Sequence, residues 1–420
     1  MEPTSIQIAA TAIFIIAIIH TFSTSFFEKI ARKSTHHKNL YHLLGEVEVV
    51  FGFWSLILMM LMALMANDYQ APIQYLEGRN FNDCLFLFAI MVVSASKPIL
   101  SFASSLVTSI SKALHKLFKL NVSMSVYFLT LSLVPILGSV ITGPAAMTLG
   151  ALLLKDNMFS KTKNITLMYW TIAVLFVNIS IAGGITNFTP PVLLVASKWG
   201  WDNVYMFNTF GIKALIAVIA NALIVTLVFN QVLPKSASGE LKNDMPTFVI
   251  AVHLLFLLSI VIFAHHPVIF MGLLLFFLGY TQAYAKYQNP LLLKQALMVS
   301  FFLGGLVVLG GLQEWWLEPV VRAMNYQWLF YGSVGLTSIA DNAAIAYLGS
   351  LVQGTSDAFK YSLIAGVLAG GGLTVIANAP NPAGAALLRV YFPNGTISAA
   401  KLLLAAVPPT AIAILAFQLF

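Results

Sequence analysis

The residues with the clearest chemical potential lie in the stretch 337–344, which has the sequence Thr-Ser-Ile-Ala-Asp-Asn-Ala-Ala. It places an acid, Asp341, beside an amide, Asn342, close to the hydroxyl of Ser338 and inside an apolar part of the chain. A carboxylate at membrane depth costs about 2.5–3.5 kcal/mol on insertion scales, so it usually faces a protein interior or a water-filled cavity. Oxygen-bearing side chains among small residues suit a small hard cation. The stretch therefore predicts a cation site, the alternative being that Asp341 caps a helix end near the surface.

The composition indicates an all-α polytopic membrane protein. Of 420 residues 59% are hydrophobic and only 9% are charged, with a mean hydropathy of +0.87, whereas a soluble protein carries about 25% charged residues. The net charge of +7 does not indicate a nucleic-acid partner, because the basic residues lie mostly in short loops between apolar runs. The single cysteine, Cys84, excludes an internal disulfide framework and a multi-cysteine metal site.

Apolar segments predict the helices that position the candidate site, since about 20 residues are needed to cross a bilayer. They fall at about 5–27, 43–66, 84–110, 123–154, 165–196, 203–233, 247–264, 267–284, 291–312, 327–355, 359–388 and 398–420. Most of them fit one crossing. Two of the longer segments, 123–154 and 327–355, carry Gly/Pro or Asp/Asn in their middles, which is typical of a helical hairpin that enters and leaves on one side.

Loop charges support this interpretation, because basic loops stay in the cytoplasm. The loops on either side of 123–154 each carry three lysines, so both are expected inside and this segment does not cross. The loop around Glu314 has no basic excess, whereas the loops before 291 and after 388 do, so 327–355 is expected to dip in from outside. The chain thus predicts about ten transmembrane helices, two re-entrant hairpins and both termini outside.

The two halves of the chain predict an inverted repeat. Residues 1–233 and 247–420 each hold five crossings and a hairpin, and the polar stretch 234–246 is expected to be a cytoplasmic linker. An odd number of crossings inverts the second half relative to the first, which is a plan of secondary transporters with a binding site near the midplane.

Each half also contains a predicted broken helix, at about 165–196 and about 359–388. The pattern Gly-Gly-apolar-Thr followed by Asn and Pro occurs within 182–191 and again within 370–382. Glycine and proline free backbone groups, which are tolerated at membrane depth where a cavity or protein satisfies them. Freed carbonyls can ligate a cation; the alternative is a pair of kinks without a ligand.

These hairpin and broken-helix motifs resemble the ion-transporter superfamily, which includes bacterial sodium/proton antiporters, the arsenite pump membrane subunit and the citrate and dicarboxylate carriers. The run 42–51, His-Leu-Leu-Gly-Glu-Val-Glu-Val-Val-Phe, is similar to the acidic second span of the antiporter branch, so the nearest resemblance is to a bacterial sodium/proton antiporter family. Gly143-Pro144 stand where antiporter relatives often have an acid–amide pair, which implies one carboxylate site and not two. The resemblance also implies the bacterial inner membrane and, by analogy only, a possible homodimer.

A sodium/proton antiporter is the function that these residues favour. Asp341 would bind the cation when it is deprotonated and a proton otherwise. The remaining ligands are expected to be oxygen-bearing side chains from the second half and then the first: Asn342, Ser338, Thr374, Asn378, Asn381, Thr142, Asn187 and Thr189. We expect no cofactor and no enzymatic activity, because the chain has no nucleophile elbow, phosphate-binding Gly-Lys-Ser/Thr loop or zinc spacing. The transported ions would be sodium and protons.

Four further charged residues could serve as proton relays or counter-ions. Glu46 and Glu48 lie early in the second span and point about 200° apart on a helix, so one could carry protons while the other, or both, lie at the interface. Lys97 and Glu314 occupy comparable positions in the two repeats. Lys97 could be a counter-ion for Asp341 or an anion ligand, whereas Glu314 precedes two tryptophans and could belong to the aromatic belt.

Two rival functions stay open. One is a sodium-coupled symporter of an anionic solute, such as a di- or tricarboxylate held by Lys97 and helix dipoles. The absence of an arginine- or hydroxyl-rich anion pocket disfavours it, and neither hairpin has the Ser-Asn-Thr triplet usual in dicarboxylate carriers. The other is a non-transporting scaffold or enzyme, which would need no inverted repeat.

Overall fold

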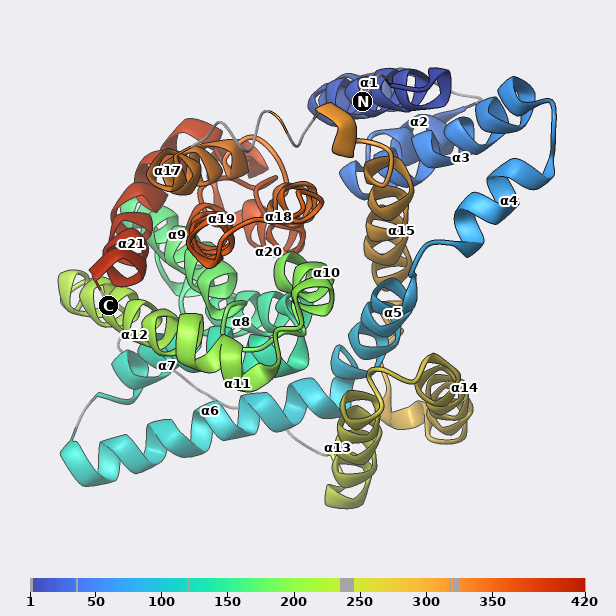
Figure 1. The fold of residues 1–420 in the computed structure, drawn as a ribbon. Coiled ribbons are helices and arrows are strands. Elements are labelled where there is room, and N and C mark those ends of the chain that lie inside the picture. The colour runs from blue at the N-terminus through green and yellow to red at the C-terminus, as the bar shows by residue number, and fades with distance from the viewer. Residues whose placement is uncertain are drawn as a thin grey trace. The chain divides into compact units, whose positions relative to one another are not determined.

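A computed structural model describes residues 3–34, 37–119, 121–234, 245–316, 319 and 325–419. Every regular element in these ranges is a helix, so the predicted all-α class is confirmed for the described residues (Figure 1). Most of the predicted linker 234–246 lies outside the described residues.

Six of the described helices are long and apolar enough to cross a membrane, which supports a multi-pass membrane protein. These are Val49–Ala66, Val122–Ile141, Ile165–Ala182, Asn203–Val228, Leu293–Gly310 and Ala399–Leu419. A seventh candidate is the pair Asn82–Ser94 and Lys97–Leu117, which is bent by 65°. Shorter apolar helices cover Ser5–Thr21, Thr247–Ile262 and Pro267–Ala283. The count of about ten crossings and the inverted repeat stay predictions.

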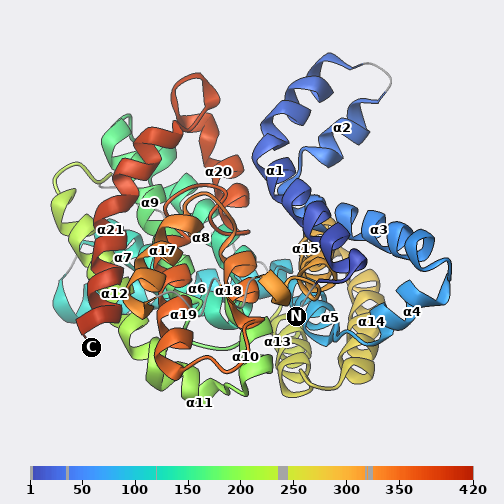
Figure 2. The same ribbon diagram turned by 45° about the horizontal axis from the view of Figure 1, so that its top comes forward.

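The chain forms two compact units. The first comprises Met1–Phe88, Leu293–Met324 and Tyr347–Thr355. Its helices are α1 (Ser5–Lys33), α2 (Lys38–Leu44), α3 (Val47–Ala66), α4 (Gln70–Glu77), the start of α5 (Asn82–Ser94), α15 (Leu293–Gly310) and the end of α18 (Asn342–Ser350). In this unit α3 packs along α15 (Figure 2). A Cβ added at Gly305 of α15 would lie 2.3 Å from the backbone nitrogen of Gly52 in α3, so glycines permit this close crossing.

The second unit comprises Ala89–Leu292, Asn325–Ala346 and Ser356–Phe420. Besides parts of α5 and α18, its helices are α6 (Lys97–Phe118), α7 (Val122–Ile141), α8 (Gly143–Asn157), α9 (Ile165–Ala182), α10 (Pro190–Trp199), α11 (Asn203–Met206), α12 (Ile212–Val228), α13 (Thr247–Ile262), α14 (Pro267–Ala283), α17 (Tyr326–Thr337), α19 (Asp357–Gly370), α20 (Asn381–Leu388) and α21 (Ala399–Leu419). A π-helical turn, Phe207–Gly211, joins α11 to α12, and 3₁₀ turns cover Phe159–Lys161, Ala285–Tyr287, Arg389–Tyr391 and Pro393–Gly395.

Helix α9 is the centre of the second unit. It packs against α7, α8, α12, α19, α20 and α21, and it is apolar all round, which is typical of a fully buried helix. Its one buried amide, Asn178, is 0% exposed and donates from Nδ2 to the carbonyl oxygens of Leu131 (2.7 Å) and Val218 (3.1 Å). Pro135 has no N–H for the carbonyl of Leu131, four residues earlier in α7, so Asn178 supplies the missing donor.

The helices of the second unit break at glycine and proline. The segment predicted as the first broken helix consists of α9 and α10, separated by 183–189, and the second consists of α19 and α20, separated by 371–380. Helices α7 and α8 pack against each other on either side of Thr142, and α17 packs along α19. The re-entrant character of the two hairpins stays a prediction.

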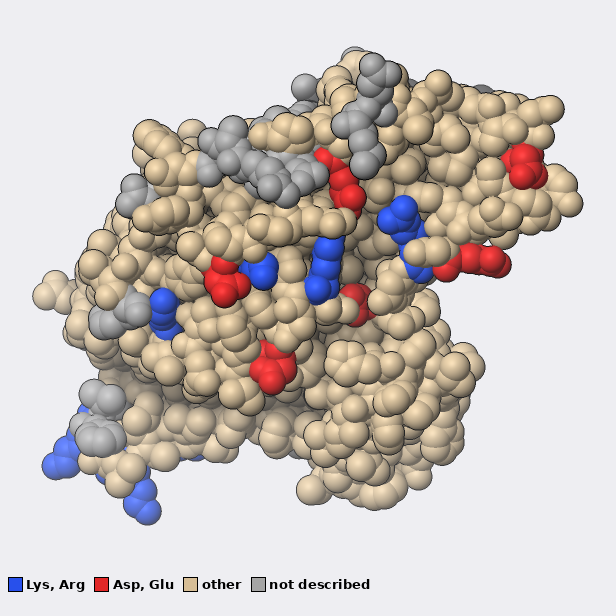
Figure 3. All heavy atoms as spheres, in the orientation of Figure 1, with Lys and Arg blue, Asp and Glu red and all other residues tan. Residues whose placement is uncertain are grey.

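Charged side chains are few on the face drawn in Figure 3. Lysines gather there at the C-terminal end of α6, where Lys116 lies in the last turn and Lys119 is the C-cap (Figure 3). Positive charge at a helix C-terminus complements the helix dipole, and the predicted topology places this end of α6 in the cytoplasm.

Candidate functional site

Asp341 lies in the short connection between α17 and α18. Its Oδ1 accepts a hydrogen bond of 2.8 Å from the N–H of Ala343, and the residue is 7% exposed. A carboxylate in this position satisfies an unpaired N–H and is stabilised by the positive end of the helix dipole. Asp341 therefore does cap a helix, as in the alternative considered from the sequence, but it does so in the protein interior and not near the surface.

Asn342, the first residue of α18, joins the α17–α18 connection to the second helix break, 371–380. Its backbone N–H donates to the carbonyl of Ala377 at 3.0 Å. Its side-chain Nδ2 is buried and has no hydrogen-bond partner among the described residues. A Cβ added at Gly371 would lie 2.7 Å from this Nδ2 and 2.2 Å from Oγ of Ser180. Only a glycine at 371 lets the amide approach the ends of α9 and α19 so closely.

Two predicted ligands, Thr374 and Asn381, line the same break. Oγ1 of Thr374 donates to the carbonyl of Ser338 at 2.8 Å, which joins the break to the α17–α18 connection. Nδ2 of Asn381 donates to the carbonyls of Gly371 (2.8 Å) and Thr374 (2.9 Å). Oδ1 of Asn381 is buried without a partner among the described residues. A buried acceptor without a donor costs about 1–3 kcal/mol, so this oxygen is available to a cation or a water molecule.

The other two second-half residues lie at the edges of this cluster. Asn378 is 5% exposed, and its carbonyl accepts from the N–H of Asn381 at 3.0 Å. Oγ of Ser338 donates to the carbonyl of Gly335 at 2.6 Å. The structure thus places the six second-half residues that the sequence predicted at the α17–α18 connection and at the second helix break, two segments that hydrogen bonds join.

The first-half residues are more dispersed. Thr142 is 2% exposed, and its Oγ1 lies 3.2 Å from Oγ of Ser94. Oγ1 of Thr189 donates to the carbonyl of Gly183 at 2.7 Å, inside the first break. Asn187 donates from Nδ2 to the carbonyl of Trp201 at 3.2 Å. Asn187 therefore lies in the first break but bonds to the loop between α10 and α11.

Two contacts nevertheless connect the halves. Oγ of Ser180 in α9 donates to the carbonyl of Leu368 in α19 at 2.7 Å. A Cβ added at Gly143, directly after Thr142, would lie 3.0 Å from Cγ of Pro380 in the second break. The C-terminal ends of α9 and α19 therefore meet beside the second break. Half-helix C-termini and unwound carbonyls carry partial negative charge and suit a small cation.

The remaining charged candidates are divided between the two units. Glu46 is the N-cap residue of α3 and pairs with Nζ of Lys294 at 3.1 Å in the first unit, while the side chain of Glu48 lies outside the described residues. Glu314 is half-buried in the first unit. Lys97 is half-buried and begins α6 in the second unit. Their predicted roles in proton relay stay predictions.

Comparison with known protein families identifies the chain. A profile of the family described as putative Na⁺/H⁺ antiporter matches residues 5–420, nearly the whole length. The chain belongs to this family. A search among curated individual proteins found no match.

Membership of this family supports a transporter that carries out cation/proton antiport across a membrane. It does not favour the anion symporter. Sequence reasoning missed two buried polar residues of α9, Ser180 and Asn178, which the structure places in contacts with other helices. The sequence did contain a signal for their burial, because both residues are polar and lie in a long apolar run within six residues of Gly183-Gly184.

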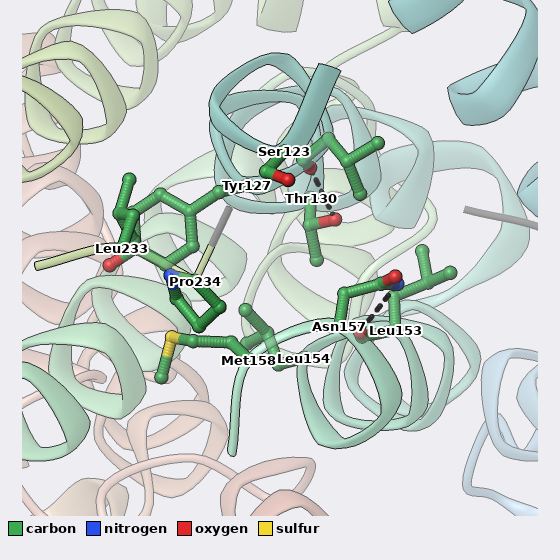
Figure 4. Close-up of a pocket in the computed structure, with 10 residues that line it drawn as sticks. Ser123, Tyr127, Thr130, Leu153, Leu154, Asn157, Met158, Leu233 and Pro234 are labelled. Carbon is green, nitrogen blue, oxygen red and sulfur yellow. Dashed lines mark hydrogen bonds between the residues drawn. The ribbon is translucent and has the colours of Figure 1, made fainter. Parts of the chain in front are cut away.

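A small pocket in the second unit lies away from this cluster (Figure 4). It is lined by the start of α7, the end of α8 and Leu233-Pro234, and its volume of about 10 Å³ has room for one water molecule. Thr142 lies at the opposite ends of α7 and α8. Oγ1 of Thr130 and Nδ2 of Asn157 already donate to carbonyls of their own helices. The pocket therefore lies apart from the cluster around Asp341.

Proposed function

We propose that the chain exchanges sodium for protons across the bacterial inner membrane, with Asp341 as the group that both ions use. The observation that carries this proposal is the buried carboxylate of Asp341, seated on a connection that is hydrogen-bonded to a helix break. A proton and a sodium ion need the same carboxylate oxygens, so the presence of one excludes the other. Such competition at one acid is sufficient for exchange when the site faces the two sides alternately.

The ligand set around Asp341 is proposed from the same contacts. Asn381 offers a buried Oδ1 without a partner. The unpartnered atom of Asn342 is Nδ2, a hydrogen-bond donor, so Asn342 would ligate the cation through its Oδ1. Ser338, Thr374 and Asn378 would complete the second-half set. Thr142 and Thr189 would contribute from the first half, whereas Asn187 reaches this cluster only if the loop at Trp201 rearranges.

Movement of the hairpins and broken helices against the rest of the protein would provide alternating access. Thr374 and Asn342 bond the α17–α18 connection to the second break, which supports their movement as one body. Ser180 would extend that body to α9 through its bond to Leu368.

Proton flux in vesicles tests this function. We expect that purified protein in vesicles with an acidic interior and a pH-sensitive dye releases protons when sodium is added outside. Lithium and potassium, added in turn, measure cation selectivity. Citrate added with sodium tests the symporter. Proton release on adding a monovalent cation supports antiport, while uptake of citrate with no response to cations alone would overturn the proposal.

A further inference from the structure

The junction between α5 and α6 places a cation where the helix dipole disfavours one. Lys97 is the first residue of α6, a helix of 22 residues, so its ammonium group belongs to the positive end of the dipole. The junction follows an apolar helix of 13 residues, which puts about 20 Å of helix between it and the loop before α5. Within the second unit, no described carboxylate forms an ion pair with Lys97. A positive charge at membrane depth needs a partner.

The N-terminus of α6 also has unused hydrogen-bond donors. Ser96 is its N-cap residue, with the extended backbone (φ −68°, ψ 148°) from which a serine hydroxyl normally caps the first turn. Its Oγ makes no such bond, and it is buried, in a residue 1% exposed, with no partner among the described residues. The N–H of Ile99 is therefore left uncapped in a fully buried residue. The hydroxyl of Ser96 and the N–H of Ile99 therefore both lie at the N-terminus of α6, where Lys97 is the first helical residue.

A second helix N-terminus meets the first. Thr142, the N-cap residue of α8, makes no side-chain cap bond to α8. Its hydroxyl instead lies 3.2 Å from that of Ser94, the last residue of α5. The backbone of Thr142 has a φ of 74°, which is unfavourable for a β-branched residue. The N-terminus of α8 thus contacts the α5–α6 junction through Thr142 and Ser94. The buried, unpartnered hydroxyl of Ser96 lies two residues after Ser94, and Lys97 follows it directly.

We propose that this junction binds a small monovalent anion of the size of chloride or acetate. The anion would accept hydrogen bonds from Oγ of Ser96 and the N–H of Ile99, and it would neutralise Lys97. Helix N-termini with unpaired N–H groups are established anion sites. The site does not depend on Asp341 and so goes beyond the proposed exchange, although Thr142 connects it to the residues around the second helix break.

Thermal unfolding in detergent tests the anion site. At constant sodium concentration, replacing gluconate, a much larger anion, by chloride is expected to raise the midpoint of thermal unfolding by about 2–4 °C, and the rise should saturate with chloride concentration. Lys97→Met should abolish the rise, Ser96→Ala should shift it to higher chloride concentration, and Lys97→Arg should keep it. Lys112→Met, which removes a lysine nearer the cytoplasmic end of α6, should also keep it.

The absence of a chloride effect in the wild type, or an equal rise in Lys97→Met, would overturn the proposal, since an equal rise is a general salt effect. Each rise is measured against the same variant in gluconate, so a change in basal stability does not hide it. If Lys97→Met does not fold, a rise that is unchanged in Ser96→Ala overturns the proposal and a shifted one supports it. Asp341→Asn should keep the full rise, which separates failure of the anion site from failure of the proposed exchange.

Discussion

Replacing Asp341 by Asn is expected to reduce cation-dependent proton flux in vesicles to the level of protein-free vesicles. The amide has nearly the same shape and keeps an oxygen that can accept from the N–H of Ala343, as Oδ1 does now. It cannot bind or release a proton, and it is a weaker ligand for a cation. The variant should therefore fold with an unfolding midpoint close to that of the wild type while exchange is lost. Dye recovery after addition of sodium measures the effect.

Asp357→Asn is the matched control. This acid lies in the first turn of α19, its side chain is 88% exposed, and its partner is Lys360 at 3.4 Å. Exposed pairs of this kind contribute about 0–1 kcal/mol, so neither stability nor flux should change appreciably. Full activity of Asp341→Asn would remove the carboxylate from the mechanism, and equal losses in both variants would indicate a general effect of removing charge.

Replacing Gly372 by Ala is expected to destabilise the protein by about 3 kcal/mol. A Cβ at this position would lie 2.3 Å from Cα and 2.4 Å from the backbone nitrogen of Val177 in α9. Both are backbone atoms of a buried helix, so the clash cannot be relieved by a side-chain rotation. The second break would have to move away from α9. The midpoint of thermal unfolding and the yield of folded protein measure the effect.

Gly272→Ala provides the comparison for this substitution. Gly272 lies in α14, and a Cβ there would meet no atom within 4 Å. Alanine is favoured over glycine in a helix by about 1 kcal/mol, so this variant should be as stable as the wild type or slightly more stable. A Gly372→Ala variant with an unchanged midpoint would show that the second break does not pack against α9 as described.

Much of the second unit follows from the sequence by simple physical rules. Two pairs of glycines, each followed by prolines within about ten residues, predict helix ends at Gly183-Gly184 and Gly371-Gly372. The helices α9 and α19 do end there. The buried position of Asp341 follows from its apolar surroundings, because an acid among small apolar residues has little access to water. Its capping bond to Ala343 follows from the preference of Asp for helix N-termini.

Other features depend on contacts that no local pattern contains. The hydroxyl of Ser180 finds its acceptor 188 residues away, at Leu368, and Asn178 pairs with a carbonyl freed by a proline in another helix. The segment 84–110, predicted as one crossing, contains a bend of 65° between Ser94 and Lys97 that the sequence analysis did not predict. Pro98 was the signal for this bend, since it has no N–H to donate to the carbonyl of Ser94, four residues earlier.

Proton release on sodium binding tests the central claim most directly. Purified protein in weakly buffered detergent solution, with a pH indicator, is titrated with sodium at equilibrium. If sodium and a proton compete for Asp341, the wild type releases protons in proportion to sodium bound, up to one per chain, and Asp341→Asn releases none. The same proton release from Asp341→Asn as from the wild type would contradict the account, because the shared group would then be another residue.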